Sequence, residues 1–244
     1  FTIIGHAHLE FLRDRCGVLQ EKTSVLDTMP DDAVAFCNGD DDLLRAMTCR
    51  QRKVTFGLSA GCDVRAVDVR DLGDEGSTCT IVAGARRIPV RISAYGQHMV
   101  YAALEGAAVG IEYGLTDAEI IRGIAAYQPV GSRARVVRTA RYTVIDDCYN
   151  ANPDSTAAAL HSMATLPAGR RVAILGNMGE LGANAAALHR ETGVCAAEAG
   201  VSLVITCGEL AKHIAAGAAA VDSAIVTASF DTLDAVSYTH LRAH

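Results

Sequence analysis

The sequence predicts an α/β protein with two domains, and three patterns support this prediction. In the second half, apolar runs of strand length alternate with helix-like segments, which is typical of a parallel, doubly wound sheet. In the first half, three alternating runs between Cys62 and Ile92 are separated by glycine-containing turns, which predicts an antiparallel meander. Between the halves, a helix opened by a capping box at Thr116 stops before Pro129. We therefore expect domains at residues 1–128 and 129–236.

The elements of the two domains follow from hydrophobic periodicity and turn signals. In the first domain we expect strands at residues 2–4, 33–37 and 52–58, the meander, and helices at 18–26, 96–109 and from 116. In the second domain we expect strands at 142–146, 171–175, 201–206 and 224–227, with helices at 153–165, 184–199, 209–216 and 232–236. The periodicity stops at residues 237–244, which we interpret as a non-native tail. The chain starts inside a strand-like run without methionine, so we expect a fragment that lacks its beginning.

Composition narrows the class of protein. The 244 residues carry a net charge of −6 without a basic stripe, which argues against a nucleic-acid partner. No apolar run approaches the length needed to span a membrane. The eight cysteines form no Cys-x-x-Cys pair, which argues against a zinc site and a disulfide framework. We expect a cytoplasmic monomer with reduced cysteines.

The stretch from Asp146 to Ser155 carries the strongest functional signal. Two carboxylates and two amides crowd a transition from a strand to a helix, with Asn152 as a good N-cap and Pro153 at the first helical position. In open α/β sheets, ligands bind at the carboxyl ends of strands. The alternative is that these are simply turn and cap residues. That explains Asn152 and Asp154 better than it explains the acidic pair, Asp146 and Asp147.

This stretch resembles a signature of the Mur ligases, the ATP-dependent enzymes that form amide bonds in peptidoglycan synthesis. It is most similar to the MurF type, which adds D-alanyl-D-alanine to UDP-N-acetylmuramoyl-tripeptide. Similar family motifs follow the first expected strand and recur at Gly131–Arg133 and Gly176–Gly182. The resemblance covers about residues 1–236. It implies the back of the central ATP-binding domain, followed by most of a Rossmann-like C-terminal domain.

The resemblance implies a magnesium site. In Mur ligases the residue that matches His8 binds Mg²⁺, and the residue that matches Lys22 is carbamylated. A carbamate offers two oxygen ligands and a negative charge, which suits a hard cation such as Mg²⁺. Without the resemblance, Lys22 would be interpreted as a solvated helix lysine and His8 as a loop histidine.

The resemblance also assigns the remaining candidate residues. It implies that Asp147 binds the ribose hydroxyls of ATP, that Arg133 binds its phosphates, and that Asn38 lies close to the nucleotide. The residues expected to line the cleft for the incoming dipeptide are Asn150, Asn152, Glu180 and His189. From the residues alone, a solvated linker arginine is a serious alternative for Arg133, and a histidine in the position of His189 is more often a solvated helix histidine.

The sequence departs from the family pattern at several positions. Met99 and Ala102 replace asparagines that lie near the adenine in family members, and Asn177 replaces an aspartate. No Gly-x-x-Gly-Lys-Thr/Ser phosphate loop occurs in the chain, and the resemblance places it before Phe1. We therefore expect this piece to be inactive alone.

The implied reaction has two steps. ATP phosphorylates the peptide carboxylate, and the amine of D-alanyl-D-alanine then displaces phosphate from the acyl phosphate. One alternative is another amide ligase of the same fold, of the diamino-acid-adding or folylpolyglutamate type. The diamino-acid-adding type would show Asp-Asn-Pro-Arg, which is absent. The other alternative is a non-catalytic nucleotide-binding module, which the missing phosphate loop favours.

Overall fold

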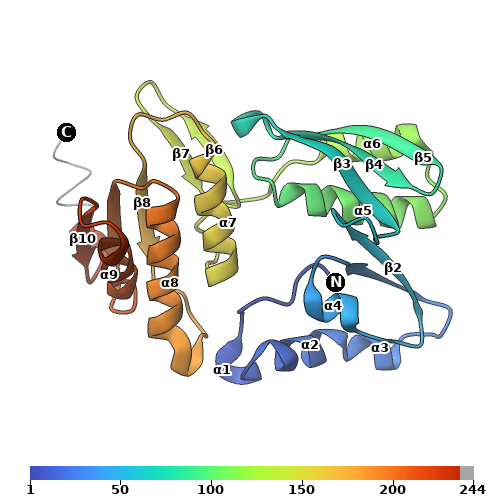
Figure 1. Cartoon of the computed structure of the whole chain (residues 1–244), viewed down its shortest axis with the longest axis horizontal. Helices are drawn as coiled ribbons and strands as arrows, with labels where there is room; N and C mark the ends of the chain where they lie inside the picture. The colour runs from blue at the N-terminus through green and yellow to red at the C-terminus, as the bar shows by residue number, and fades with distance from the viewer. Residues whose placement is uncertain (237–244) are drawn as a thin grey trace. The chain divides into compact units, whose positions relative to one another are not determined.

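The computed structural model describes residues 1–236, and the chain forms two compact units (Figure 1). Unit 1 contains Phe1–Gly5 and Asp14–Asp147, and unit 2 contains His6–Arg13 and the chain from Cys148 onward. The proposed tail, residues 237–244, lies outside the described residues. The expected domain border near residue 128 stays a prediction. No helix among residues 1–236 is long and apolar enough to cross a membrane.

Unit 1 is built on a five-stranded sheet in the order β1-β2-β3-β4-β5. Its strands are β1 (Val34–Asn38), β2 (Arg52–Gly57), β3 (Val64–Asp71), β4 (Ser77–Ala83) and β5 (Arg86–Ile92). The first three strands are parallel, and β3, β4 and β5 pair antiparallel, so the predicted meander is confirmed. The first expected strand is not formed. Phe1 instead makes two backbone hydrogen bonds beside β1, to Phe36 O and from Asn38 N.

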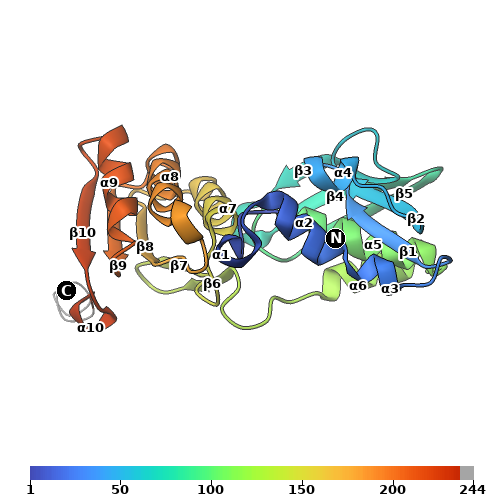
Figure 2. The ribbon, with the colours of Figure 1, turned by 90° about the horizontal axis from the view of Figure 1, so that it is seen from below.

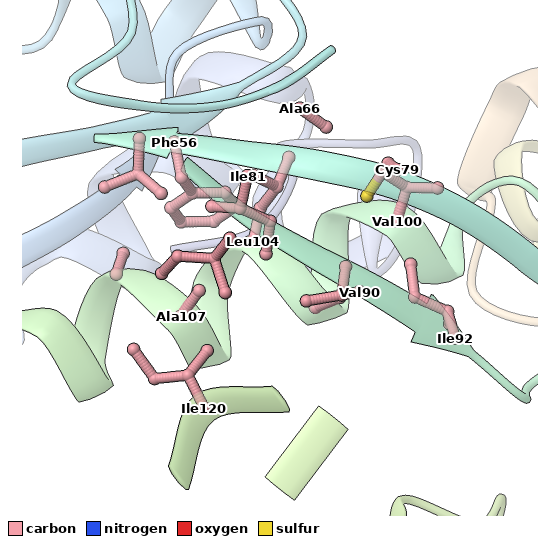
Figure 3. Packing of buried hydrophobic residues seen from close by; sticks show 14 of the residues in the cluster. Phe56, Ala66, Cys79, Ile81, Val90, Ile92, Val100, Leu104, Ala107 and Ile120 are labelled. Atoms are coloured by element: carbon pink, nitrogen blue, oxygen red, sulfur yellow. The ribbon is translucent and has the colours of Figure 1, made fainter. Parts of the chain in front are cut away.

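Five helices accompany this sheet. They are α2 (Arg15–Thr23), α3 (Val25–Thr28), α4 (Asp42–Ala46), α5 (Met99–Glu112) and α6 (Asp117–Ala126). Figure 3 shows the core between the strands and α5, where Phe56, Ile81 and Leu104 are fully buried. Helix α6 starts with the predicted capping box, in which Thr116 accepts from Glu119 N while the Glu119 carboxylate accepts from Thr116 N.

The strand that ends at Asp146 differs from the prediction. It forms β7 (Thr143–Asp146), and its partner is β6 (Arg135–Arg138) in a separate antiparallel pair. It was expected to join the parallel sheet of the second domain, which is wrong for the described structure. The short β6 follows a segment rich in arginine, so its two central valines were not recognised as a strand. The adjacent β7 could therefore not be assigned to a hairpin.

Unit 2 contains a three-stranded parallel sheet in the order β10-β9-β8 (Figure 2). Its strands are β8 (Val172–Gly176), β9 (Leu203–Cys207) and β10 (Val226–Phe230), and its helices are α1 (Leu9–Leu12), α7 (Pro153–Ala164), α8 (Ala185–Glu198), α9 (Lys212–Val221) and α10 (Leu233–Val236). The alternation of strands and helices is confirmed, with boundaries shifted by a few residues. Side chains of α7, α8 and α9 form one core with Ala173 and Val204 of the sheet.

Helices α8 and α9 approach each other through glycines. A Cβ added at Gly193 would lie 2.0 Å from Ile214 O, and one added at Gly217 would lie 2.1 Å from Arg190 O. Only residues without a side chain allow the two backbones to come this close. This packing holds the middle of α8 against α9, and α8 follows the loop that carries Glu180.

Candidate active site

The segment His6–Arg13 lies within unit 2 and carries two histidines that face carboxylates. His6 Nδ1 lies 3.1 Å from Asp154 Oδ1, and the His6 amide donates to Asp154 Oδ2 at 2.6 Å. His8 Nδ1 is paired with Glu180 Oε2. The Glu10 amide also donates to the carbonyl of Glu180 at 2.9 Å. The structure therefore brings together His8 and Glu180, two of the residues singled out from the sequence.

His189 stabilises the loop that carries Glu180, because it hydrogen-bonds to the backbone of that loop. This side chain is 0% exposed; its Nε2 accepts from Met178 N at 2.9 Å, and its Nδ1 donates to Ala185 O at 2.6 Å. Burial lowers the pKa of His189 below its ordinary value, so the ring stays neutral and keeps its acceptor. The ring is buried and both of its nitrogens bond within unit 2. The expectation that His189 lines the substrate cleft stays a prediction.

Asn177, the departure from the family aspartate, also has a local role. Its Oδ1 accepts from Ala211 N at 2.8 Å, one residue before α9 begins. A Cβ at Gly208, which has a φ of 106°, would collide with the Asn177 amide at 2.5 Å. The asparagine therefore connects the loop after β8 to the start of α9.

The strand-to-helix stretch contains structural contacts at most of its polar residues. Asp147 Oδ1 accepts from Ala134 N at 2.9 Å, within unit 1. In unit 2, Asn152 accepts from Ser155 N at 2.9 Å and forms a capping box at the start of α7. Asn150 is exposed and its Oδ1 accepts from Ala151 N at 3.0 Å. The cap predicted for Asn152 is confirmed, whereas ligand contacts of these three residues stay predictions.

Asn38 lies in a network of polar contacts in unit 1. It is 9% exposed; its Nδ2 donates to Thr2 O at 2.8 Å and its Oδ1 accepts from Asp40 N at 2.9 Å. Asp40 in turn accepts from Leu58 N and from Tyr101 Oη. Burial, followed by this hydrogen bond, raises the pKa of Tyr101 to about 12, so its hydroxyl remains a donor. Contact of Asn38 with a nucleotide stays a prediction.

The other half of the expected metal site lies in unit 1. Lys22 is exposed in the last turn of α2. Arg133, expected to bind phosphate, is also exposed, between α6 and β6. Because His8 and Lys22 belong to different units, their shared magnesium site stays a prediction.

The donor groups present can be tested against the chemistry of Mg²⁺. Within residues 1–236, no three His, Cys, Asp or Glu side chains gather in a group that could hold a metal ion. Magnesium usually takes one or two protein ligands and completes its shell with water and substrate phosphates. The residues therefore fit an ion shared with a nucleotide, and they do not fit an ion enclosed by protein alone.

Sequence reasoning missed the contact between His6 and Asp154. Asp154 was interpreted as a turn or cap residue, yet it contacts a histidine 148 positions away in the sequence. The available signal was the alternation of His6 and His8, which places both rings on one short segment.

Two family models match separate stretches of the chain. The Mur ligase middle domain matches residues 1–110, and the Mur ligase glutamate ligase domain matches residues 132–243. The chain belongs to the Mur ligase family and comprises its middle and C-terminal domains.

Similar proteins indicate which type of Mur ligase the chain resembles. The UDP-N-acetylmuramoyl-tripeptide–D-alanyl-D-alanine ligase of Bacillus subtilis is 30% identical over 222 residues, covering 89% of this chain and 47% of the relative. The Mycobacterium bovis protein of the same name is 35% identical and covers 84% and 42%. A crystal structure of MurF from Acinetobacter baumannii has a TM-score of 0.87 at 25% identity, covering 98% of this chain and 51% of that one. The chain thus spans about half the length of the relatives it matches.

Proposed function

We propose that this chain forms part of an ATP-dependent ligase of peptidoglycan precursor synthesis, which joins D-alanyl-D-alanine to UDP-N-acetylmuramoyl-tripeptide. The observation that carries the proposal is the similarity of 89% and 84% of the chain to two relatives named for this reaction, at 30% and 35% identity. The stretch Asp146–Ser155 supports the MurF type.

The proposed reaction forms an acyl phosphate and then an amide. The carboxylate oxygen of the peptide attacks the γ-phosphorus of ATP and ADP leaves; the dipeptide amine then attacks the acyl carbon, loses a proton and expels phosphate. Magnesium, when bound, offsets the negative charge of the transferring phosphoryl group. We assign His8 and carbamylated Lys22 to hold that ion.

The remaining residues are assigned to the binding of ATP and of the incoming dipeptide. Asp147 would orient the ribose, Arg133 the phosphates, and Asn38 would act near the nucleotide; a guanidinium suits phosphate because its donors match the oxygens in pairs. Asn150 and Asn152 would contact the dipeptide. For Glu180 and His189, their hydrogen bonds support indirect roles, Glu180 acting through His8 and His189 through the loop that carries Glu180. We further propose that the protein acts as a monomer in the cytoplasm, where ATP and UDP-linked precursors are available, without nucleic acid or a membrane as partner.

A chimera tests this proposal. The chain is fused behind the part of the Bacillus subtilis relative that precedes the matched region. Phosphate release from ATP should then require both UDP-N-acetylmuramoyl-tripeptide and D-alanyl-D-alanine, and L-alanyl-L-alanine should not replace the dipeptide. A folded chimera that accepts a diamino acid or glutamate instead would favour another ligase of this fold. Nucleotide binding without any phosphate release would favour a non-catalytic module.

A further inference from the structure

The contact between His8 and Glu180 joins two residues with unusual backbone conformations. His8 has a φ of 60° and Glu180 a φ of 59°, in the left-handed region that non-glycine residues seldom adopt. Such conformations persist only where the surroundings enforce them, and they concentrate at functional sites. Here the strained residues are paired with each other through their side chains.

The surroundings that enforce this geometry are buried and backbone-based. Leu9 and Leu181, the residues that follow the two strained positions, are 7% and 2% exposed. The Glu10 amide donates to the Glu180 carbonyl, and a Cβ on Gly182 would approach Glu10 Cα to 3.2 Å. The two turns are therefore packed together independently of the Glu180 carboxylate. The pair of His6 and Asp154 gives this segment a second attachment.

The hydrogen bond between His8 Nδ1 and the Glu180 carboxylate determines which nitrogen of the neutral His8 ring carries the proton. A carboxylate only accepts hydrogen bonds, so the proton of a neutral His8 resides on Nδ1. The Nε2 lone pair is then free, because no side chain or backbone group of residues 1–236 hydrogen-bonds to it. Metal-binding histidines commonly have this arrangement, in which a carboxylate fixes the tautomer and the orientation of the ring.

We propose that Glu180 is a positioning residue that holds His8 in the Nδ1–H tautomer, so that Nε2 is presented to an electrophile such as a divalent cation. The proposal rests on the proposed function for the identity of that electrophile. Both side chains are about half exposed, at 57% and 49%, so water competes for this hydrogen bond. The strained, buried turns offset that competition because they align the two side chains in advance.

Because the turns at His8 and Glu180 pack together without the Glu180 carboxylate, the carboxylate can be replaced while the turns stay in place. Glu180→Asn shortens the side chain by one methylene, and asparagine tolerates a positive φ. Glu180→Gln keeps the length and an accepting oxygen. Glu191→Gln is the matched control, because Glu191 is an exposed acid on the neighbouring helix α8.

The measurement is a long-range ¹H–¹⁵N correlation spectrum of the 244-residue chain labelled at histidine nitrogens, with His8 signals identified from a His8→Gln variant. At a pH where His8 is neutral, the parent chain and Glu191→Gln should show a protonated Nδ1 on His8. Glu180→Asn should lower the ratio of Nδ1–H to Nε2–H tautomers by about tenfold or more, since the bond to a charged acceptor is lost. Glu180→Gln should retain part of that preference.

An unchanged His8 tautomer in Glu180→Asn would overturn the proposal, as would an Nε2–H tautomer in the parent chain. Loss of the His6 contact in Glu180→Asn, seen as an altered His6 signal, would also overturn it, because Glu180 would then hold the whole segment. These outcomes do not depend on turnover. An inactive chimera with the expected tautomers would refute the proposed function and leave the positioning role in place.

Discussion

Replacing His189 by phenylalanine should destabilise unit 2, because this ring forms two hydrogen bonds in a fully buried position. Met178, whose amide donates to Nε2, is 1% exposed, so the substitution leaves a buried donor without an acceptor. Such an orphaned group costs about 1–3 kcal/mol, and loss of the bond to Ala185 O adds about 1 kcal/mol. We therefore expect the free energy of unfolding to fall by about 2–4 kcal/mol.

His161 provides the matched control. Its Nδ1 contacts Ala157 O four residues earlier at 2.8 Å, as His189 contacts Ala185 O, but His161 is exposed on α7. His161→Phe should change stability by about 0.5 kcal/mol or less. Urea denaturation measures both variants, and hydrogen exchange of the Met178 amide should accelerate only in His189→Phe. Equal stability and equal exchange in the two variants would refute the reasoning.

The same ring predicts a dependence on pH. Because burial lowers the pKa of His189, the folded chain binds this proton less readily than the unfolded chain. The stability contribution is therefore complete above the ordinary pKa of 6.5, and it is lost as the pH falls through the lowered pKa of the folded state. His189→Phe should remove this part of the acid slope, and an unchanged slope would assign it to other groups.

Three further predictions follow from glycine packing, from the missing phosphate loop and from the proposed metal site. Gly193→Ala and Gly217→Ala should each lower the free energy of unfolding, measured in urea, by about 1–3 kcal/mol. The control Gly106→Ala, with no heavy atom within 4 Å of the added Cβ, should stabilise α5 by about 0.5–1 kcal/mol. Equal effects of the three substitutions would contradict the close approach of α8 and α9. Residues 1–244 alone should release no phosphate in response to both ligase substrates, and substrate-dependent release would show that the chain is sufficient. In the chimera, Lys22→Ala should lose most turnover and recover part of it with added formate or acetate, while Lys22→Arg should not recover; near-normal turnover of Lys22→Ala would make Lys22 an ordinary helix lysine.

Local signals were sufficient to predict much of the fold. The capping box at Thr116 joins residues three positions apart, so the sequence shows both partners at once, and the N-cap at Asn152 is likewise a local signal. The alternation of strands and helices in unit 2 is likewise visible as hydrophobic periodicity. The pairing of β7 with β6 was not predicted, because strand partners depend on contacts that periodicity does not encode.

In the candidate site, too, local motifs were predicted and long-range contacts were not. His8 and Glu180 were each singled out from motifs, but their contact spans 172 positions and relies on two left-handed backbones that nothing in their residue types requires. From the residues alone, His189 was interpreted as a solvated helix histidine. Its burial follows from the way in which the loop after β8 folds over the start of α8.

Transfer of oxygen during turnover tests the central claim most directly. The chimera is supplied with ATP, D-alanyl-D-alanine and UDP-N-acetylmuramoyl-tripeptide that carries ¹⁸O in its reacting carboxylate, and the released phosphate is analysed by mass spectrometry. An acyl phosphate places one oxygen of the carboxylate in the phosphate, so each phosphate released from fully labelled substrate should carry one ¹⁸O. Unlabelled phosphate, formed while the amide accumulates, would contradict the account.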